Sequence, residues 1–65
     1  MDRSTEIINI IEKNPGIKFR EIMRVTGLKN GVLSYHAKKL EEIGSVKIER
    51  KSGETRFYPL FVTEE

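Results

Sequence analysis

The sequence predicts a small α+β domain, mainly α-helical, in which three helices precede one β-hairpin. Apolar residues recur at helical spacing in three segments that Gly and Pro residues separate, at about residues 3–13, 18–26 and 30–43. A segment at about residues 45–60 instead alternates between apolar and polar side chains around a Gly turn, and a short tail follows at 61–65. We expect the whole chain to be one domain, because 65 residues leave no room for a second core.

The first two helices are predicted from their apolar faces and their ends. Four isoleucines fall on one face of the first helix: Ile7, Ile8, Ile10 and Ile11. Asp2 or Ser4 could cap its start, and Pro15 and Gly16 end it. Gly27 closes the second helix, whose apolar face contains Phe19, Ile22 and Met23.

The third predicted helix has one apolar and one polar face and ends at Gly44. Its apolar face contains Leu33, His36, Ala37, Leu40 and Ile43. Its polar face contains Gly31, Ser34, Tyr35, Lys38 and Lys39. Because His36 shares a face with core residues, we expect it to be partly buried and hydrogen-bonded to the backbone.

The hairpin is predicted from strand periodicity on both sides of a turn. Val46, Ile48 and Arg50 alternate with polar residues, and the turn lies at 51–54. Pro59 cannot donate to a ladder, so it marks a sheet edge or the end of the pairing. Either Phe57 or Tyr58 should close the ribbon onto the core; alternation alone leaves both open. The predicted core is Ile7, Ile8, Ile10, Ile11, Phe19, Ile22, Met23, Leu28, Leu33, Leu40, Ile43, Val46 and Ile48.

Composition argues against several classes of function. The chain has no Cys and one His, so we expect no disulfide, no zinc site and no cofactor. A single His without Cys or a converging carboxylate is a poor basis for catalysis, so we expect a protein that is not an enzyme. No small-molecule ligand is evident. The sequence contains no membrane-spanning apolar run and no signal-peptide pattern, so a cytoplasmic location is expected.

Charge is distributed unevenly along a chain whose net charge is only +2. Between Lys29 and Arg56 there are seven basic residues and four acidic ones. Such an excess attracts phosphate. The alternative is a solvated Lys/Glu-rich surface of the kind that heat-stable proteins often carry.

Three motifs resemble one family of regulators. Residues 27–46, GLKNGVLSYHAKKLEEIGSV, resemble the turn and recognition helix of ArsR-like and MarR-like transcriptional regulators. Residues 50–58, RKSGETRFY, are similar to the basic wing of that family, and residues 14–22 to the start of its second helix. The resemblance covers roughly residues 7–60. It implies a winged helix-turn-helix fold and binding of double-stranded DNA as a small transcriptional regulator.

The sequence also departs from the family pattern. Lys29 stands where the family prefers a Ser cap, Ala37 replaces a core Leu, and Ser45 replaces an apolar residue. The metal-binding residues of the ArsR branch and the long dimerisation helices of MarR-like proteins are missing from this sequence. The resemblance therefore implies a DNA-binding module, and it does not extend to metal or ligand sensing.

The third helix would enter the major groove with its N-terminal turns leading. The residues expected to contact DNA from this region are Lys29, Asn30, Gly31, Ser34, Tyr35, Lys38 and Lys39. Polar groups in the first turns would reach base edges, and the two later lysines would reach phosphates. Gly31 would let the helix backbone approach the DNA closely.

Several of these residues have a structural alternative. Asn30 could be the helix cap, Tyr35 could pack on Val32, and Ser34 could be a neutral surface residue. Gly31 lowers helix stability unless it lies in the first turn or serves a close approach. Two lysines could pair with acidic residues at helical spacing: Lys38 and Lys39 with Glu41 and Glu42.

The wing and the second helix supply the remaining candidates. Arg50, Lys51, Ser52 and Arg56 are expected at the ribbon tip, where they would grip phosphates or enter the minor groove. Alternatively, they keep an edge hairpin soluble. Two further residues open the second helix, close to the DNA backbone in this fold: Lys18 and Arg20.

A second hypothesis makes the domain a protein-interaction winged helix within a transcription or repair assembly. Leu60, Phe61 and Val62 motivate it, because an apolar tail could dock on a partner or on a second copy. The sequence leaves open whether the protein is a monomer, a homodimer or a fragment of a longer chain.

Overall fold

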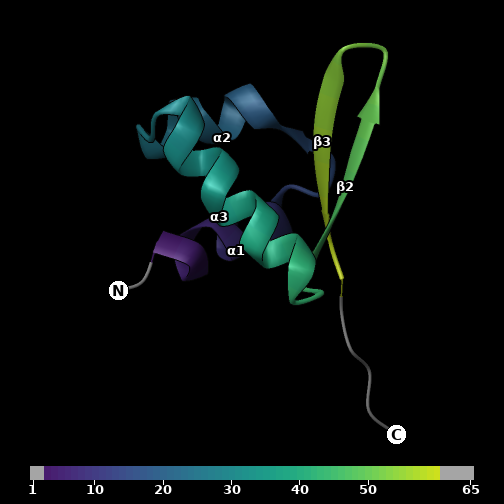
Figure 1. The fold of residues 1–65 in the computed structure, drawn as a ribbon, viewed down its shortest axis with the longest axis horizontal. Helices are drawn as coiled ribbons and strands as arrows, with labels where there is room; N and C mark the ends of the chain where they lie inside the picture. The colour runs from purple at the N-terminus through teal and green to yellow at the C-terminus, as the bar shows by residue number, and fades with distance from the viewer. Residues whose placement is uncertain (1–2, 61–65) are drawn as a thin grey trace, which may run out of the picture.

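The computed structural model describes residues 3–60 and contains three helices and a three-stranded antiparallel sheet (Figure 1). The elements in chain order are α1 (Arg3–Lys13), β1 (Ile17–Lys18), α2 (Phe19–Thr26), α3 (Asn30–Glu42), β2 (Val46–Lys51) and β3 (Glu54–Pro59). The helices form one layer against the sheet, whose strand order is β1-β3-β2, and the β2–β3 hairpin extends beyond them. The predicted class, three helices with a small hairpin in an α+β fold, is confirmed.

The structure adds a strand that the sequence analysis missed. Ile17 pairs with Phe57 and Lys18 pairs with Arg56, so β1 lies beside β3 and makes β3 the middle strand. The second helix accordingly begins at Phe19, and Lys18 is its N-cap residue without a side-chain cap hydrogen bond. Two residues are too few to display a strand period, so only the partner strand reveals β1.

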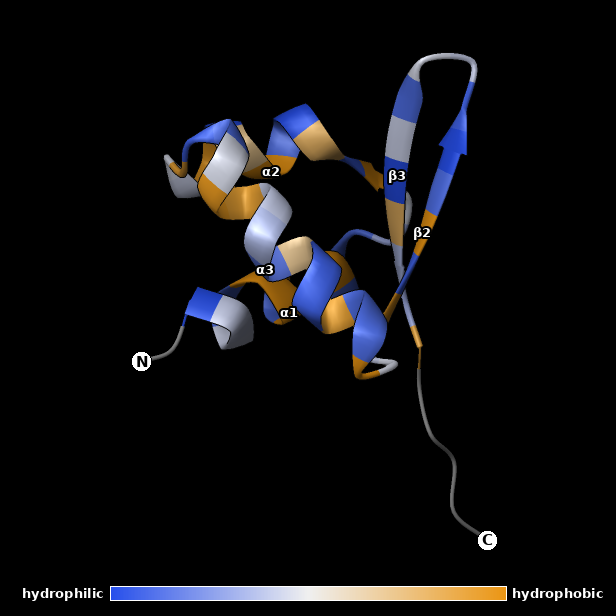
Figure 2. Cartoon of the chain, viewed as in Figure 1, coloured by the Kyte–Doolittle hydropathy of each residue, from blue (hydrophilic) through white to orange (hydrophobic). Residues whose placement is uncertain are grey.

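The core lies where the three helices meet the sheet. Its buried members are Ile7, Ile11, Ile22, Leu33, Ala37, Leu40, Val46 and Phe57. Partly buried apolar residues surround it: Ile8, Ile10, Ile17, Phe19, Met23, Leu28 and Ile48. Figure 2 shows hydrophobic segments on the helices and in the lower part of the strands, and an upper hairpin that is mainly hydrophilic. Phe57, not Tyr58, closes the sheet onto the core, and its ring stacks on Phe19 with centroids 6.2 Å apart.

The prediction that Ile43 belongs to the core was wrong. Its side chain is 70% exposed. The helix ends at Glu42, and Ile43 is the C-cap residue, followed by Gly44 at a φ of +82°. The chain turns away at this point, so Ile43 does not continue the buried face formed by Leu33 and Leu40.

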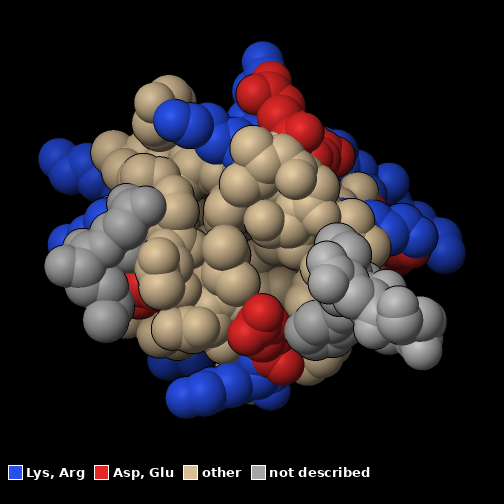
Figure 3. Space-filling view, turned by 90° about the horizontal axis from the view of Figure 1, so that it is seen from below, with Lys and Arg blue, Asp and Glu red and all other residues tan. Residues whose placement is uncertain are grey.

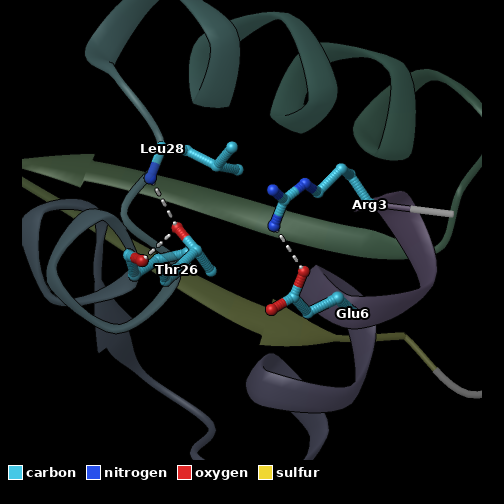
Figure 4. Close-up of polar contacts among 5 residues, drawn as sticks. Arg3, Glu6, Thr26 and Leu28 are labelled. Atoms are coloured by element: carbon cyan, nitrogen blue, oxygen red, sulfur yellow. Dashed lines mark hydrogen bonds and ion pairs between the residues drawn. The ribbon is translucent and has the colours of Figure 1, made fainter. Parts of the chain in front are cut away.

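The turn between α2 and α3 is held by hydrogen bonds rather than by a capping side chain at Lys29. The N–H of Gly27, whose φ is +76°, donates to the Met23 carbonyl at 2.8 Å. The Thr26 hydroxyl donates to the Ile22 carbonyl and accepts from the Leu28 N–H at 3.2 Å (Figure 4). These bonds set the direction in which α3 leaves α2.

The hairpin turn has two consecutive residues with positive φ, Ser52 at 51° and Gly53 at 78°. Such a pair matches the twist of the flanking strands in two-residue hairpins. Pro59 is the last residue of β3, opposite Val46, so it ends the pairing. Beyond it the Leu60 N–H donates to the Ser45 carbonyl at 3.0 Å. The proposed cap Asp2 and the apolar residues Phe61 and Val62 lie outside the described residues.

His36 is half-buried, as expected, but its partner differs from the predicted backbone group. Its Nδ1 lies 3.3 Å from the Ser4 hydroxyl of α1, thirty-two residues away in the chain. The start of α1 passes close to α3, so a side chain distant in sequence takes the place of a backbone partner. No helix within residues 3–60 is long and apolar enough to cross a membrane.

Candidate nucleic-acid interface

The outward face of α3 carries the polar residues that the sequence placed there. Lys29, Asn30, Gly31, Ser34, Tyr35, Lys38 and Lys39 are all exposed. Asn30 is the first helical residue, and the N-cap is Lys29, so the interpretation of Asn30 as the cap was wrong. The Asn30 side-chain oxygen instead accepts a hydrogen bond from the Ser34 hydroxyl at 3.4 Å. The first two turns of α3 therefore present two linked polar groups to solvent.

Gly31 lies in open space in the first turn of α3. A Cβ atom added there would meet no neighbouring atom within 4 Å, and the backbone φ is not positive. Neither packing inside residues 3–60 nor backbone conformation explains a glycine at this position. A ligand that approaches the helix backbone from outside would explain it.

Tyr35 lies on the same face and is 60% exposed. The ring meets His36 edge-on, with centroids 5.4 Å apart, and the Lys39 ammonium lies 5.4 Å from its centroid. A cation and an aromatic ring at this distance attract each other weakly. Tyr35 is thus contacted from two sides while the residue stays largely exposed.

The predicted ion pairs on α3 do not form. Within residues 3–60, neither Lys38 nor Lys39 has a carboxylate within 4.0 Å. Glu41 points instead toward the sheet, where its Oε2 lies 4.0 Å from Arg50 Nη1. Both lysine charges therefore remain available to an outside anion.

The wing tip carries Lys51 and Ser52 at its exposed turn, with Arg50 just before it. Arg56 is not at the tip, which corrects the prediction. It lies on the middle strand between β1 and β2, where its Nη1 donates to the Gly16 carbonyl at 3.0 Å. Its Nε donates to Glu54 Oε1, also at 3.0 Å. Only the pairing of β3 with β1 brings the Gly16 carbonyl within reach.

The start of α2 lies beside the wing. Lys18 Nζ lies 3.4 Å from Glu54 Oε2, and Arg20 is exposed with no carboxylate within 4.0 Å among the described residues. The hydrogen bond from Arg56, and then that from Lys18, hold the pKa of Glu54 below its ordinary value. On the next turn, Arg24 lowers the pKa of Glu21 in the same way. Sequence reasoning missed Glu54, because Arg56 lies two residues along the same strand but Lys18 comes within reach only through the pairing of β1 with β3.

A groove separates α3 from the sheet and joins these candidates. Its larger part, about 580 Å³, is lined by Ser34 and Lys38 on one side and by Arg50 and Thr55 on the other. A neighbouring part of about 360 Å³ continues to Lys18 and Arg20. Both parts share Phe19 and Asn30. The floor, which includes Phe19, Ile48 and Phe57, is apolar and was not predicted as part of the site.

Basic side chains therefore border the groove from α2, α3 and β2, and two carboxylates, Glu41 and Glu54, also line it. Within residues 3–60, no group of three or more His, Cys, Asp or Glu side chains converges as metal ligands would. A groove with an apolar floor and a basic rim fits an extended polyanion, whose charged backbone would run between the two rims.

Comparisons with known proteins agree with this geometry. The family model HTH_HVO_0163_N, described as an N-terminal HTH domain, matches residues 1–64. A structure described as "Crystal Structure of MarR" superposes with a TM-score of 0.85 over 92% of this chain, at 21% sequence identity. The chain spans 46% of that MarR chain, so about half of MarR has no counterpart here. No curated protein matches the chain significantly.

The fold is thus a MarR-like winged helix-turn-helix, as the sequence motifs implied, with α2 and α3 as the helix-turn-helix and β2–β3 as the wing. Helix-turn-helix domains of this kind belong to DNA-binding transcription regulators. This chain belongs to the HTH_HVO_0163_N family of N-terminal helix-turn-helix domains.

Proposed function

We propose that the domain binds double-stranded DNA with α3 in the major groove and the β2–β3 wing on the DNA backbone or in the minor groove. The observation that carries this proposal is the shared groove, whose two rims hold Lys38 and Arg50 and which continues to Arg20. The rims lie on separate elements, so one DNA backbone could contact both at once.

Base recognition falls to the first half of α3. Asn30 and Ser34 offer a donor and an acceptor each, and Tyr35 offers a hydroxyl and an apolar ring that can pack on a thymine methyl. Gly31 leaves the helix backbone open to a close approach. Lys38 and Lys39, one to two turns later, contact phosphates and fix the register of the helix in the groove.

Phosphate binding elsewhere falls to the wing and to the start of α2. Arg50, Lys51 and Ser52 meet the backbone or the minor groove from the wing. Lys29, Lys18 and Arg20 lie on the α2 and α3 sides. The first N–H groups of α2 have no side-chain cap, and uncapped N–H groups at a helix start favour a phosphate. Arg56 stabilises the wing and does not contact DNA, because its guanidinium donates hydrogen bonds to Gly16 and Glu54.

The test is a titration of the domain with duplex DNA selected from a random pool, measured by fluorescence anisotropy at several salt concentrations. The logarithm of the binding constant should fall linearly with the logarithm of salt, by about 0.9 for each phosphate contacted. Tyr35→Ala should weaken binding to the selected sequence more than to a scrambled duplex. The control is Lys13→Gln on α1, which removes a charge outside the groove lining. It should change neither the salt slope nor the ratio of the affinities for the selected and the scrambled duplex. Absence of binding at low salt would rule the proposal out.

A second candidate function is docking on a protein, either in a transcription or repair assembly or as a homodimer. The observation that favours it is the pair of exposed apolar residues Ile43 and Leu60, 70% and 47% exposed. They are close in the fold, because the Leu60 N–H bonds the carbonyl of Ser45, two residues after Ile43. Figure 3, viewed from below, shows a face that is largely uncharged in its middle, with an acidic group beside this area and both basic and acidic groups at its rim.

Analytical sedimentation of the wild-type domain and of Ile43→Ser measures the oligomeric state and so tests whether this face forms a homodimer. Self-association that Ile43→Ser abolishes would support a homodimer through this face. A monomer that binds DNA in the same way with and without Ile43 would remove the homodimer and leave only docking on a different protein.

A further inference from the structure

The carboxylate of Glu54 lies between two cations at the rim of the groove. Its Oε1 accepts a hydrogen bond from Arg56 Nε at 3.0 Å, and its Oε2 lies 3.4 Å from Lys18 Nζ. The two cations come from neighbouring strands, since Lys18 of β1 pairs in register with Arg56 of β3. Glu54 thus occupies both positive groups with its two oxygens, in the way that a phosphate could.

The two contacts of Glu54 differ in how firmly they are held. Arg56 is anchored a second time, by its bond to the Gly16 carbonyl, so its guanidinium stays within the sheet. Within residues 3–60 the Lys18 ammonium has no second carboxylate within 4.0 Å, and Lys18 lines the groove beside Arg20. The Glu54 side chain itself is 46% exposed. Exposed ion pairs are weak, so an outside anion can exchange for the carboxylate at Lys18 more readily than at Arg56.

We propose that Glu54 is an internal competitor of the DNA phosphate at Lys18, an inference that rests on the proposed function. In the free domain the carboxylate holds Lys18. When DNA enters the groove, the carboxylate and a phosphate compete for Lys18, so the wild type leaves this phosphate contact largely unmade, and Glu54 keeps its hydrogen bond with Arg56. Contacts with phosphate do not depend on sequence, so Glu54 weakens binding to every duplex and leaves discrimination to α3.

The competition makes Lys18 different from Arg20 and Lys38, the groove cations without a nearby carboxylate among the described residues, whereas Arg50 lies 4.0 Å from Glu41. Within residues 3–60, Arg20, Lys38 and Lys51 have no carboxylate within 4.0 Å and can contact phosphate without displacing a partner. Removal of the charge of Glu54 should therefore act through Lys18 and not through the whole surface.

The experiment compares Glu54→Gln with Glu12→Gln in titrations with one mixed-sequence duplex over a range of salt. Both variants remove one negative charge, but Glu12 lies on α1, away from the groove. Glu54→Gln keeps the shape of the side chain and can still accept a hydrogen bond from Arg56. We expect it to bind more tightly and to have a salt slope steeper by about 0.9, the value for one added phosphate contact. Glu12→Gln should keep the wild-type slope.

A double-mutant cycle decides whether the gain passes through Lys18. Lys18→Gln should weaken binding only slightly in the wild type and more strongly in Glu54→Gln, because only there is the ammonium free beforehand. Circular dichroism melting shows that each variant is folded, and Glu54→Asp, which keeps the charge, should behave like the wild type in slope.

Three outcomes would overturn the inference. An unchanged slope in Glu54→Gln would show that the carboxylate does not compete. Weaker DNA binding by a folded Glu54→Gln would show that Glu54 stabilises the wing in its binding conformation and does not compete with phosphate. If Lys18→Gln weakened DNA binding equally in the wild type and in Glu54→Gln, the two residues would not be coupled in binding. In each of these cases the wild type still binds DNA, whereas a wild type that binds no duplex would refute the proposed function itself.

Discussion

The cations of α3 and those of the sheet differ in what surrounds them. Lys38 and Lys39 of α3 have no carboxylate within 4.0 Å among the described residues. On the sheet, by contrast, Arg56 and Lys18 contact Glu54, Lys47 contacts Glu49 at 3.5 Å, and Arg50 approaches an acidic residue of α3. Equal charges thus serve two purposes: those of α3 are available to a ligand, and most of those of the sheet also hold the wing in place.

The largest effect should come from removing the residue that attaches the sheet to the helices. Phe57→Ala deletes a ring that is 1% exposed and stacked on Phe19. We expect the free energy of unfolding to fall by about 3–5 kcal/mol, because a large cavity opens in a small core. A loss of that size is a large part of the stability of any small domain. Urea denaturation followed by circular dichroism measures it; Tyr58→Ala, at a half-buried position, should cost less. A folded, equally stable Phe57→Ala would contradict this account of the core.

The next largest effect tests the comparison directly. Lys38→Gln combined with Lys39→Gln should reduce the magnitude of the salt slope of DNA binding by about 0.9 for each lysine that contacts a phosphate. Stability should change by less than about 0.5 kcal/mol, since both lysines are exposed and form no ion pair with the described part of the chain. Arg56→Gln is the matched change on the sheet and should instead lower the free energy of unfolding, by about 1 kcal/mol. If both changes affected DNA binding alone, the distinction between the two regions would be lost.

A smaller effect is expected at Gly31. Gly31→Ala places a methyl group in open space, so stability should rise by up to about 0.5–1 kcal/mol. DNA binding should nevertheless weaken, because the methyl group would occupy the space into which the DNA is proposed to enter. Thermal melting and anisotropy titration of the same sample measure the two changes. Tighter binding would show that the glycine has no role at the interface.

The smallest effect is a pH dependence at Glu54. Arg56 and Lys18 lower the pKa of Glu54 in the folded domain. Since the unfolded chain binds this proton more readily, the ion pairs stabilise the fold above the unfolded pKa, and that contribution is lost as pH falls through the folded pKa. An NMR titration of the Glu54 carboxyl carbon should give a pKa below the ordinary Glu value, and Arg56→Gln should raise it. An identical pKa in the variant would mean that Arg56 is not the main cause.

Much of the fold could be predicted, because it depends on local patterns. The isoleucines of α1, the Gly27 cap and the alternation of Val46 and Ile48 each reflect residues a few positions apart. Ile43 shows the limit of such patterns. It continues the helical spacing of Leu40, but the helix stops one residue earlier, and periodicity does not mark where a helix ends.

For the candidate site, the sequence could predict which side chains are exposed on α3, but not which cations are paired. The contacts of Arg56 with Gly16 and of Lys18 with Glu54 join residues about forty positions apart. No spacing rule applies across such a distance. The groove floor formed by Phe19 and Phe57 was missed for the same reason.

By itself the sequence determined the order of the elements, the faces of the three helices and the residues of the hairpin turn, because hydrophobic period and glycine conformation act within one or two turns of chain. The tertiary structure alone decided that Ile17 and Lys18 form a strand, that His36 meets Ser4, and that Glu54 lies between Lys18 and Arg56. Those contacts arise only when distant segments pack against the shared core, and short-range patterns do not encode such approaches.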